Sequence, residues 1–124
     1  MSIAEDMLDQ EALAVAGVSA HGRGFGFRVW RHLQSKGIRV YPVNPKADEI
    51  MGEKVYPSVK DLPEPVGGVI TVVPPERTVE VVRDCIEAGI TRVWMQPGSE
   101  GEEALRLARE AGIEVSTGAC MLML

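Results

Sequence analysis

The chain has little cysteine, an excess of acidic over basic residues and no long hydrophobic run, and each of these features excludes a class of protein. Two cysteines, Cys85 and Cys120, are too few for a disulfide framework, so we expect a reducing, cytoplasmic location. No apolar run approaches the roughly 18 residues of a membrane span, and the first residues lack the pattern of a signal peptide. We therefore expect neither membrane insertion nor secretion.

The formal net charge is −5, from 13 lysines and arginines against 18 aspartates and glutamates. Without a cluster of basic residues, the sequence is a poor match to proteins that bind nucleic acid or anionic membranes. Cysteine and histidine do not occur at metal-ligand spacing, and no serine–histidine–carboxylate order stands out. We therefore predict neither a metal site nor catalytic residues.

The length of 124 residues and the ordinary globular composition predict one domain over residues 1–124, with an N-terminal helix in 1–11 and a core over 12–120. Short apolar or β-branched runs alternate there with segments of helical periodicity. The runs predict strands at 13–18, 38–43, 69–73, 92–96 and 113–116. This alternation predicts an α/β fold, a Rossmann-like three-layer sandwich with a mainly parallel sheet of about five strands.

Local signals predict where the helices begin and end. Ser2 with Glu5, and Ser99 with Glu102, form capping boxes, and Ser58 is placed to cap a short helical turn. The helices between the strands are predicted to end at the glycines that follow them, which are Gly37, Gly89 and Gly112.

The loop after the first predicted strand, residues 17–26, is rich in glycine and includes Ser19 and Arg23. Ligands of parallel α/β sheets bind outside the carboxyl ends of the strands. Gly17 lets the backbone approach a ligand, the amides at the start of the next helix favour an anion, and the Arg23 guanidinium suits phosphate. The loop is neither G-x-G-x-x-G nor a P-loop. Alone, it indicates a phosphate-bearing ligand no more strongly than a glycine-rich connection without one.

The end of the second predicted strand narrows the choice of ligand. NAD-binding domains usually place a carboxylate there to bind the ribose hydroxyls, whereas this chain has none before Asp48. Lys46 suits a phosphorylated ribose, as in coenzyme A (CoA) or NADP. A solvent-exposed turn lysine is an equally good interpretation of Lys46 taken alone.

Four strings occur in order along about residues 12–120: GVS at 17–19 with Arg23, YPVNP at 41–45, GEKVYPS at 52–58 and VWMQPG at 93–98. Together they resemble the small CoA-binding-domain proteins. That fold is shared with the N-terminal domains of the succinyl-CoA synthetase alpha subunit and of NDP-forming acyl-CoA synthetases. The resemblance implies that CoA is the ligand.

The resemblance also implies where CoA lies. The loop at 17–26 would wrap the diphosphate, the turn at 42–46 would meet the adenosine, and Val73 with Pro74 would pack on the adenine or ribose. The residues predicted to bind CoA are Gly17, Ser19, Arg23, Gly24, Gly26, Val43, Asn44, Lys46, Val73, Pro74, Gln96 and Gly98. The sequence departs from the family where Arg23 is followed by Gly-Phe-Gly, and where Val73-Pro74-Pro75-Glu76 resembles the synthetases more than the small proteins.

We therefore predict a stand-alone module that binds CoA or an acyl-CoA without catalysis of its own, as a homo-oligomer or a partner subunit in acyl-CoA metabolism. His21 and Cys120 are open cases, because a ligand contact competes with an exposed loop histidine and a packed thiol. Two alternatives remain open. One is a small NADP-linked oxidoreductase. The other is an interaction protein with a vestigial nucleotide fold, in which residues 121–124 dock a partner.

Overall fold

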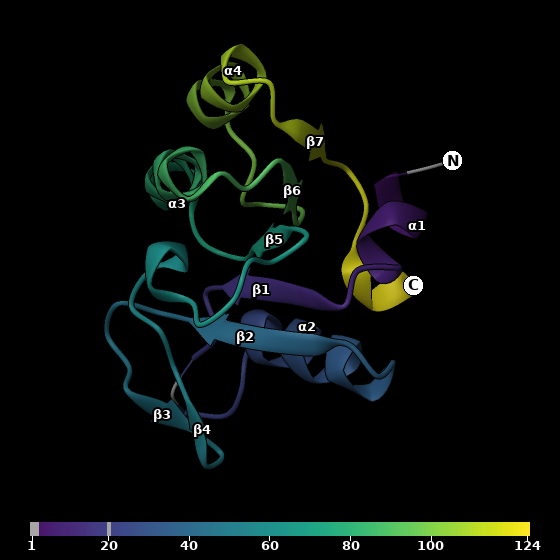
Figure 1. Cartoon of the computed structure of the whole chain (residues 1–124), viewed down its shortest axis with the longest axis vertical. Coiled ribbons are helices and arrows are strands. Elements are labelled where there is room, and N and C mark those ends of the chain that lie inside the picture. The colour runs from purple at the N-terminus through teal and green to yellow at the C-terminus, as the bar shows by residue number, and fades with distance from the viewer. Residues whose placement is uncertain (1–2, 20) are drawn as a thin grey trace.

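Five parallel strands form the sheet at the centre of the computed structural model, which describes residues 3–19 and 21–124 (Figure 1). The sheet order is β2-β1-β5-β6-β7, with every neighbouring pair parallel. The strands are β1 (Ala12–Ala16), β2 (Arg39–Val43), β5 (Val69–Thr71), β6 (Arg92–Met95) and β7 (Glu114–Ser116). The chain steps from β1 outward to β2 and then returns to β5 on the other side of β1. The strand order therefore reverses between β1 and β5, and the predicted Rossmann-like α/β fold is confirmed.

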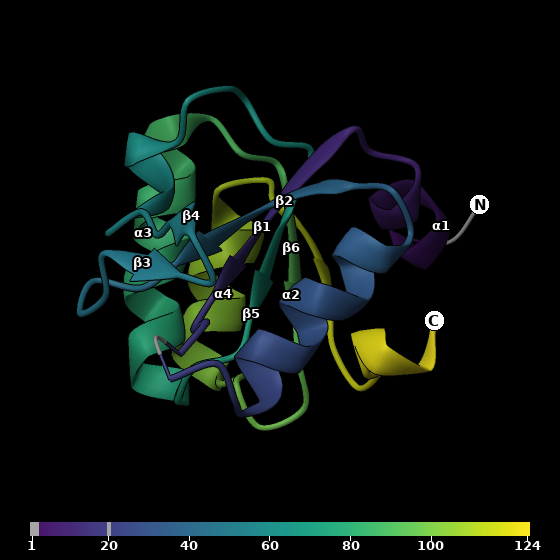
Figure 2. The same cartoon turned by 90° about the horizontal axis from the view of Figure 1, so that it is seen from below.

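Helices cover both faces of the sheet, which gives three layers (Figure 2). One face carries α1 (Ile3–Leu8), α2 (Phe25–Ser35) and the short 3-10 helix η2 (Met121–Met123), while the other carries α3 (Pro75–Ala88) and α4 (Glu102–Glu110). Each face has its own buried cluster, with Trp30 and Trp94 in the first and Val82 and Cys85 in the second. None of the helices in the described part of the chain is long and apolar enough to cross a membrane.

The chain between β2 and β5 leaves the main sheet. It forms a hairpin of β3 (Glu49–Ile50) and β4 (Glu53–Lys54), then the 3-10 helix η1 (Val59–Asp61). The hairpin turns through Met51 and Gly52, which both have positive φ. As predicted, the Ser58 side chain caps η1, because it accepts a hydrogen bond from the Lys60 amide.

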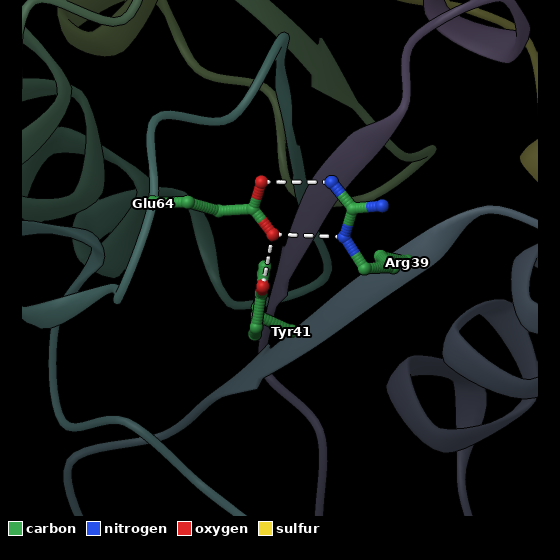
Figure 3. A network of polar contacts seen from close by, with 3 residues as sticks. All are labelled: Arg39, Tyr41 and Glu64. Atoms are coloured by element: carbon green, nitrogen blue, oxygen red, sulfur yellow. Dashed lines mark hydrogen bonds and ion pairs between the residues drawn. The ribbon is translucent and has the colours of Figure 1, made fainter.

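A network of three polar residues links the segment between η1 and β5 to the edge strand β2 (Figure 3). Arg39 donates from Nε and Nη2 to the two carboxylate oxygens of Glu64, at 2.8 Å each, and the Tyr41 hydroxyl donates to the same carboxylate. Donation from Arg39 and then Tyr41 lowers the pKa of Glu64 to about 2. The network joins the segment after η1 to β2, the outermost strand of the sheet.

The predicted helix ends agree with the structure, since Gly37, Gly89 and Gly112 all have positive φ directly after a helix. The predicted capping box at Ser99 is wrong. Helix α4 begins after Gly101, with no side-chain cap, because the buried Ser99 hydroxyl instead donates toward the Thr71 and Gln96 carbonyl oxygens. The other predicted cap, Ser2, lies outside the described residues.

Candidate ligand-binding site

Two glycines bring three backbone segments together where the strand order reverses. Gly17 follows β1 with φ +113°, and a Cβ atom there would lie 2.3 Å from the Val72 carbonyl oxygen. A Cβ at Gly26, in the first turn of α2, would lie 2.1 Å from the Gly17 carbonyl oxygen. Only glycine fits at either position, so the start of α2 rests directly on the end of β1, beside the end of β5.

The first turn of α2 presents backbone N–H groups without a side-chain cap. Gly24 is the N-cap residue, with φ 95° and ψ 174°, and no side chain of the described residues bonds to the amides that follow it. Uncapped amides at the start of a helix carry partial positive charge and attract anions. Arg23 is exposed beside this turn and makes no ion pair within residues 3–19 and 21–124, whereas Ser19 Oγ already accepts from the His21 amide at 3.1 Å.

A cavity of about 650 Å³ opens outside the ends of β1, β2 and β5 and continues along α3. Its basic residues are Lys46, Arg77 and Arg83. Arg77 faces Glu80 at 3.7 Å, while Lys46 and Arg83 have no ion-pair partner in the described part of the chain. Two cations at this cavity are thus available to an anionic ligand.

The other two carboxylates of the first cavity, Asp84 and Glu87, already form ion pairs. Lys60 pairs with Asp84 at 3.6 Å and with Glu87 at 3.1 Å, and Ser58 Oγ donates to Asp84 at 2.9 Å. These contacts partly neutralise the acidic wall that α3 contributes. They reduce the repulsion that a bound phosphate would otherwise meet there.

Asn44 connects the two loops that border the first cavity. Its Nδ2 donates to the Val18 carbonyl oxygen and its Oδ1 accepts from the Lys46 amide, both at 2.9 Å. The side chain therefore fixes the turn after β2 against the loop after β1. The hydrogen bond that Asn44 Oδ1 accepts holds the backbone of Lys46 in place beside the cavity.

A second cavity, of about 640 Å³, lies on the other side of the β5 end. It shares Val72, Val73 and Pro74 with the first cavity, so the two are adjacent. Its remaining lining residues come from the start of α2, the start of α3, the loop after β6 and the segment before η2, and they are Phe25, Pro75, Gln96, Pro97, Gly98, Ser99 and Cys120.

The structure brings most of the predicted site residues together. Gly17, Val43, Asn44, Lys46, Val73 and Pro74 line the first cavity, and Val73, Pro74, Gln96 and Gly98 line the second. Ser19, Arg23, Gly24 and Gly26 line neither cavity and belong to the loop between β1 and α2 and its junction with the helix.

Arg77, Arg83 and Phe25 line the cavities but were missed by sequence reasoning. Periodicity places the two arginines on α3, yet it cannot show that this helix faces the turn after β2. Their distance in sequence from Lys46 hides the shared wall. No signal in the sequence alone distinguishes them from ordinary surface arginines.

The family model of the CoA binding domain matches residues 11–124. Two curated relatives differ in size. The ADP-forming acetate–CoA ligase II of Archaeoglobus fulgidus is 32% identical over 122 residues, which cover 89% of this chain and 18% of the ligase. The uncharacterized protein YneT of Bacillus subtilis is 29% identical over 119 residues, which cover 96% of this chain and 88% of YneT. The chain thus spans about a fifth of the length of the ligases that it matches.

Two solved structures are similar to this chain over most of its length. A conserved hypothetical protein from Pyrococcus furiosus is 41% identical, with a TM-score of 0.85 over 91% of this chain and 97% of the other. A hypothetical protein from Pyrococcus horikoshii is 34% identical, with a TM-score of 0.91 over 98% of this chain and 86% of the other. Because the family model covers nearly the whole chain, this protein belongs to the CoA-binding-domain family.

Proposed function

We propose that this protein binds coenzyme A across the two adjacent cavities. The 3′-phosphorylated adenosine lies in the first cavity, the diphosphate lies at the uncapped start of α2, and the pantetheine arm enters the second cavity. The module is a single domain without catalysis of its own. It acts in acyl-CoA metabolism in the cytoplasm, where it transfers its ligand to a partner.

The observation that carries this proposal is the contrast in charge between the cavities. Lys46 and Arg83 lie unpaired at the first cavity within the described chain, whereas no charged side chain lines the second. CoA has the matching asymmetry, with its phosphates at one end and an uncharged thiol arm at the other. Electrostatic complementarity of this kind fixes the orientation of a ligand more than its raw affinity.

The position of the cavities supports the same ligand. Both open at the reversal between β1 and β5, where sheets of this topology bind nucleotides. The names of the related acetate–CoA ligases include CoA, but this chain covers only about a fifth of their length. We therefore propose that this protein binds CoA, and we do not propose that it catalyses the ligase reaction.

Isothermal titration tests the proposal with CoA, 3′-dephospho-CoA, ATP, NAD and NADP under one buffer. We expect saturable heat with CoA, affinity for 3′-dephospho-CoA at least about tenfold weaker because a charge-assisted contact is lost, and no binding of NAD. Binding of NADP together with no binding of CoA would show that the cavities hold a nicotinamide cofactor instead.

A further inference from the structure

The second cavity differs in chemistry from the first, and we propose that it holds the acyl group of an acyl-CoA thioester. The protein would then bind CoA carrying an uncharged, apolar acyl group more tightly than free CoA. This inference rests on the proposed function, because it requires the pantetheine arm to enter the second cavity.

The walls of the second cavity are predominantly apolar. Val72 and Val73 form its border with the first cavity, Pro74 and Pro75 line it at the start of α3, and Pro97 lines it from the loop after β6. Among residues 3–19 and 21–124, no aspartate, glutamate, lysine or arginine belongs to this lining. A ligand group that carries charge would lose its hydration there without gaining an opposite charge.

The polar side chains of the cavity are already satisfied within the protein. Ser99, 2% exposed, donates toward the Thr71 and Gln96 carbonyl oxygens. Gln96, also 2% exposed, accepts from Trp94 Nε1 at 3.1 Å and from the Met121 amide at 2.7 Å, and its Nε2 donates to Cys120 Sγ at 3.2 Å. These groups have little capacity left for a polar ligand, so an apolar group is the better match.

Phe25 gives the cavity an exposed aromatic wall. Phe25 is the first residue of α2 and is 56% exposed, and the Arg28 guanidinium lies 5.3 Å from its ring centroid. An acyl group packed on this ring removes apolar surface from water on both partners, which favours binding. Free CoA ends in a thiol and has no acyl group to pack on this ring.

Size and continuity allow one ligand to fill both cavities. The second cavity, at about 640 Å³, lies within the range of roughly 300 to 1,000 Å³ that is usual for small-molecule sites. Val72, Val73 and Pro74 line both cavities, so a ligand that crosses the end of β5 would contact both of them. The thioester would then lie in the cavity that Cys120 also lines.

The first experiment compares CoA, acetyl-CoA, butyryl-CoA, benzoyl-CoA and succinyl-CoA by isothermal titration against the whole chain. We expect butyryl-CoA and benzoyl-CoA to bind at least about tenfold more tightly than CoA, from burial of several methylene-sized groups. Succinyl-CoA should gain less than butyryl-CoA, because its carboxylate loses hydration in a cavity whose lining residues are uncharged. Equal affinity for all five ligands would overturn the inference while leaving the proposed function intact.

Variants then locate the acyl group. Cys120→Phe fills the second cavity and should weaken the binding of butyryl-CoA at least about tenfold more than the binding of CoA, because CoA has no acyl group to accommodate there. Ala119→Phe is the matched control, because Ala119 is exposed, neighbours Cys120 and does not line the cavity. Phe25→Ala provides a second test at an exposed position and should reduce the preference without affecting folding.

Alkylation of Cys120 gives a readout that does not depend on heat. Butyryl-CoA should slow the reaction of Cys120 with iodoacetamide at least about fivefold more than desulfo-CoA does at equal saturation, because the acyl group covers the Cys120 thiol and neither ligand has a free thiol to consume the reagent. Equal protection by the two ligands would overturn the inference. Failure of the wild type to bind any CoA species would overturn the proposed function itself.

Discussion

Gly17 and Val72 approach so closely that a Cβ atom on residue 17 would lie 2.3 Å from the Val72 carbonyl oxygen. This contact joins the ends of β1 and β5 where the strand order reverses, and both candidate cavities border it. Because φ at Gly17 is +113°, a side chain here is opposed by backbone strain as well as by the clash.

Gly17→Ala should therefore destabilise the protein strongly, by about 3 kcal/mol, as the sum of backbone strain and displaced strand ends. Urea unfolding followed by circular dichroism measures this loss. Gly37→Ala is the matched control, since Gly37 also has positive φ but a Cβ there has no atom within 4 Å. It should cost only about 1 kcal/mol, from the left-handed backbone alone. Equal losses would contradict the steric argument.

Lys46→Ala should weaken CoA binding about tenfold and leave 3′-dephospho-CoA binding nearly unchanged, because the lysine is expected to contact the 3′-phosphate. Isothermal titration of both ligands measures the difference. Lys36→Ala serves as control, since Lys36 is exposed at the opposite end of α2 and lines neither cavity. A uniform loss for both ligands would indicate that Lys46 binds another part of CoA.

Arg83→Ala tests whether α3 takes part in phosphate binding. We expect a loss similar to that of Lys46→Ala and a double variant weaker than either, because both cations line one cavity. Raising the salt concentration should weaken the wild type more than the double variant, since the salt-sensitive contacts are then gone. Unchanged affinity in Arg83→Ala would exclude the arginine from the site.

Most of the fold and part of the site follow from local sequence patterns. Alternating apolar runs predict the five strands, and Gly37 and Gly89 mark helix ends correctly, because these signals depend on neighbours in sequence. Gly26 is different. The glycine-rich pattern of residues 17–26 predicts that Gly26 belongs to a ligand loop, whereas in the structure glycine is required there by the close packing of α2 on Gly17.

The errors and omissions arise where tertiary contacts compete with local ones. Ser99 fits a capping box, yet its hydroxyl faces the end of β5, a strand 28 residues earlier at Thr71. Arg83 reaches the cavity only because the sheet order places α3 opposite the turn after β2. Neither relationship can be read from spacing along the chain.

The two cysteines should react very differently with iodoacetamide. Burial raises the pKa of the Cys85 thiol to about 12, and the side chain is fully covered, whereas Cys120 is half-buried at a cavity. Since the thiolate is the nucleophile, only Cys120 should be alkylated in the native protein near neutral pH. Peptide mass spectrometry after labelling identifies the site, and Cys120→Ser should remain unlabelled until urea unfolds it. Native labelling of Cys85 would contradict the packing of α3 on the sheet.

Glu64 should make stability depend on pH in a defined window. Its pKa is lowered from 4.5 to about 2 by donation from Arg39 and Tyr41, so the folded state favours the carboxylate form. The stabilisation is complete above pH 4.5, where the unfolded chain is also ionised, and is lost as the pH falls toward about 2. The wild type should therefore exceed Glu64→Gln in stability at neutral pH, and this advantage should shrink below pH 4.5.

Urea unfolding of both proteins across this window measures the effect. Tyr41→Phe refines it, because removing one of the two donors leaves the pKa of Glu64 less depressed and moves the loss of stability to higher pH. An advantage of the wild type over Glu64→Gln that stays constant with pH would show that packing, and not the ionised carboxylate, joins this segment to β2.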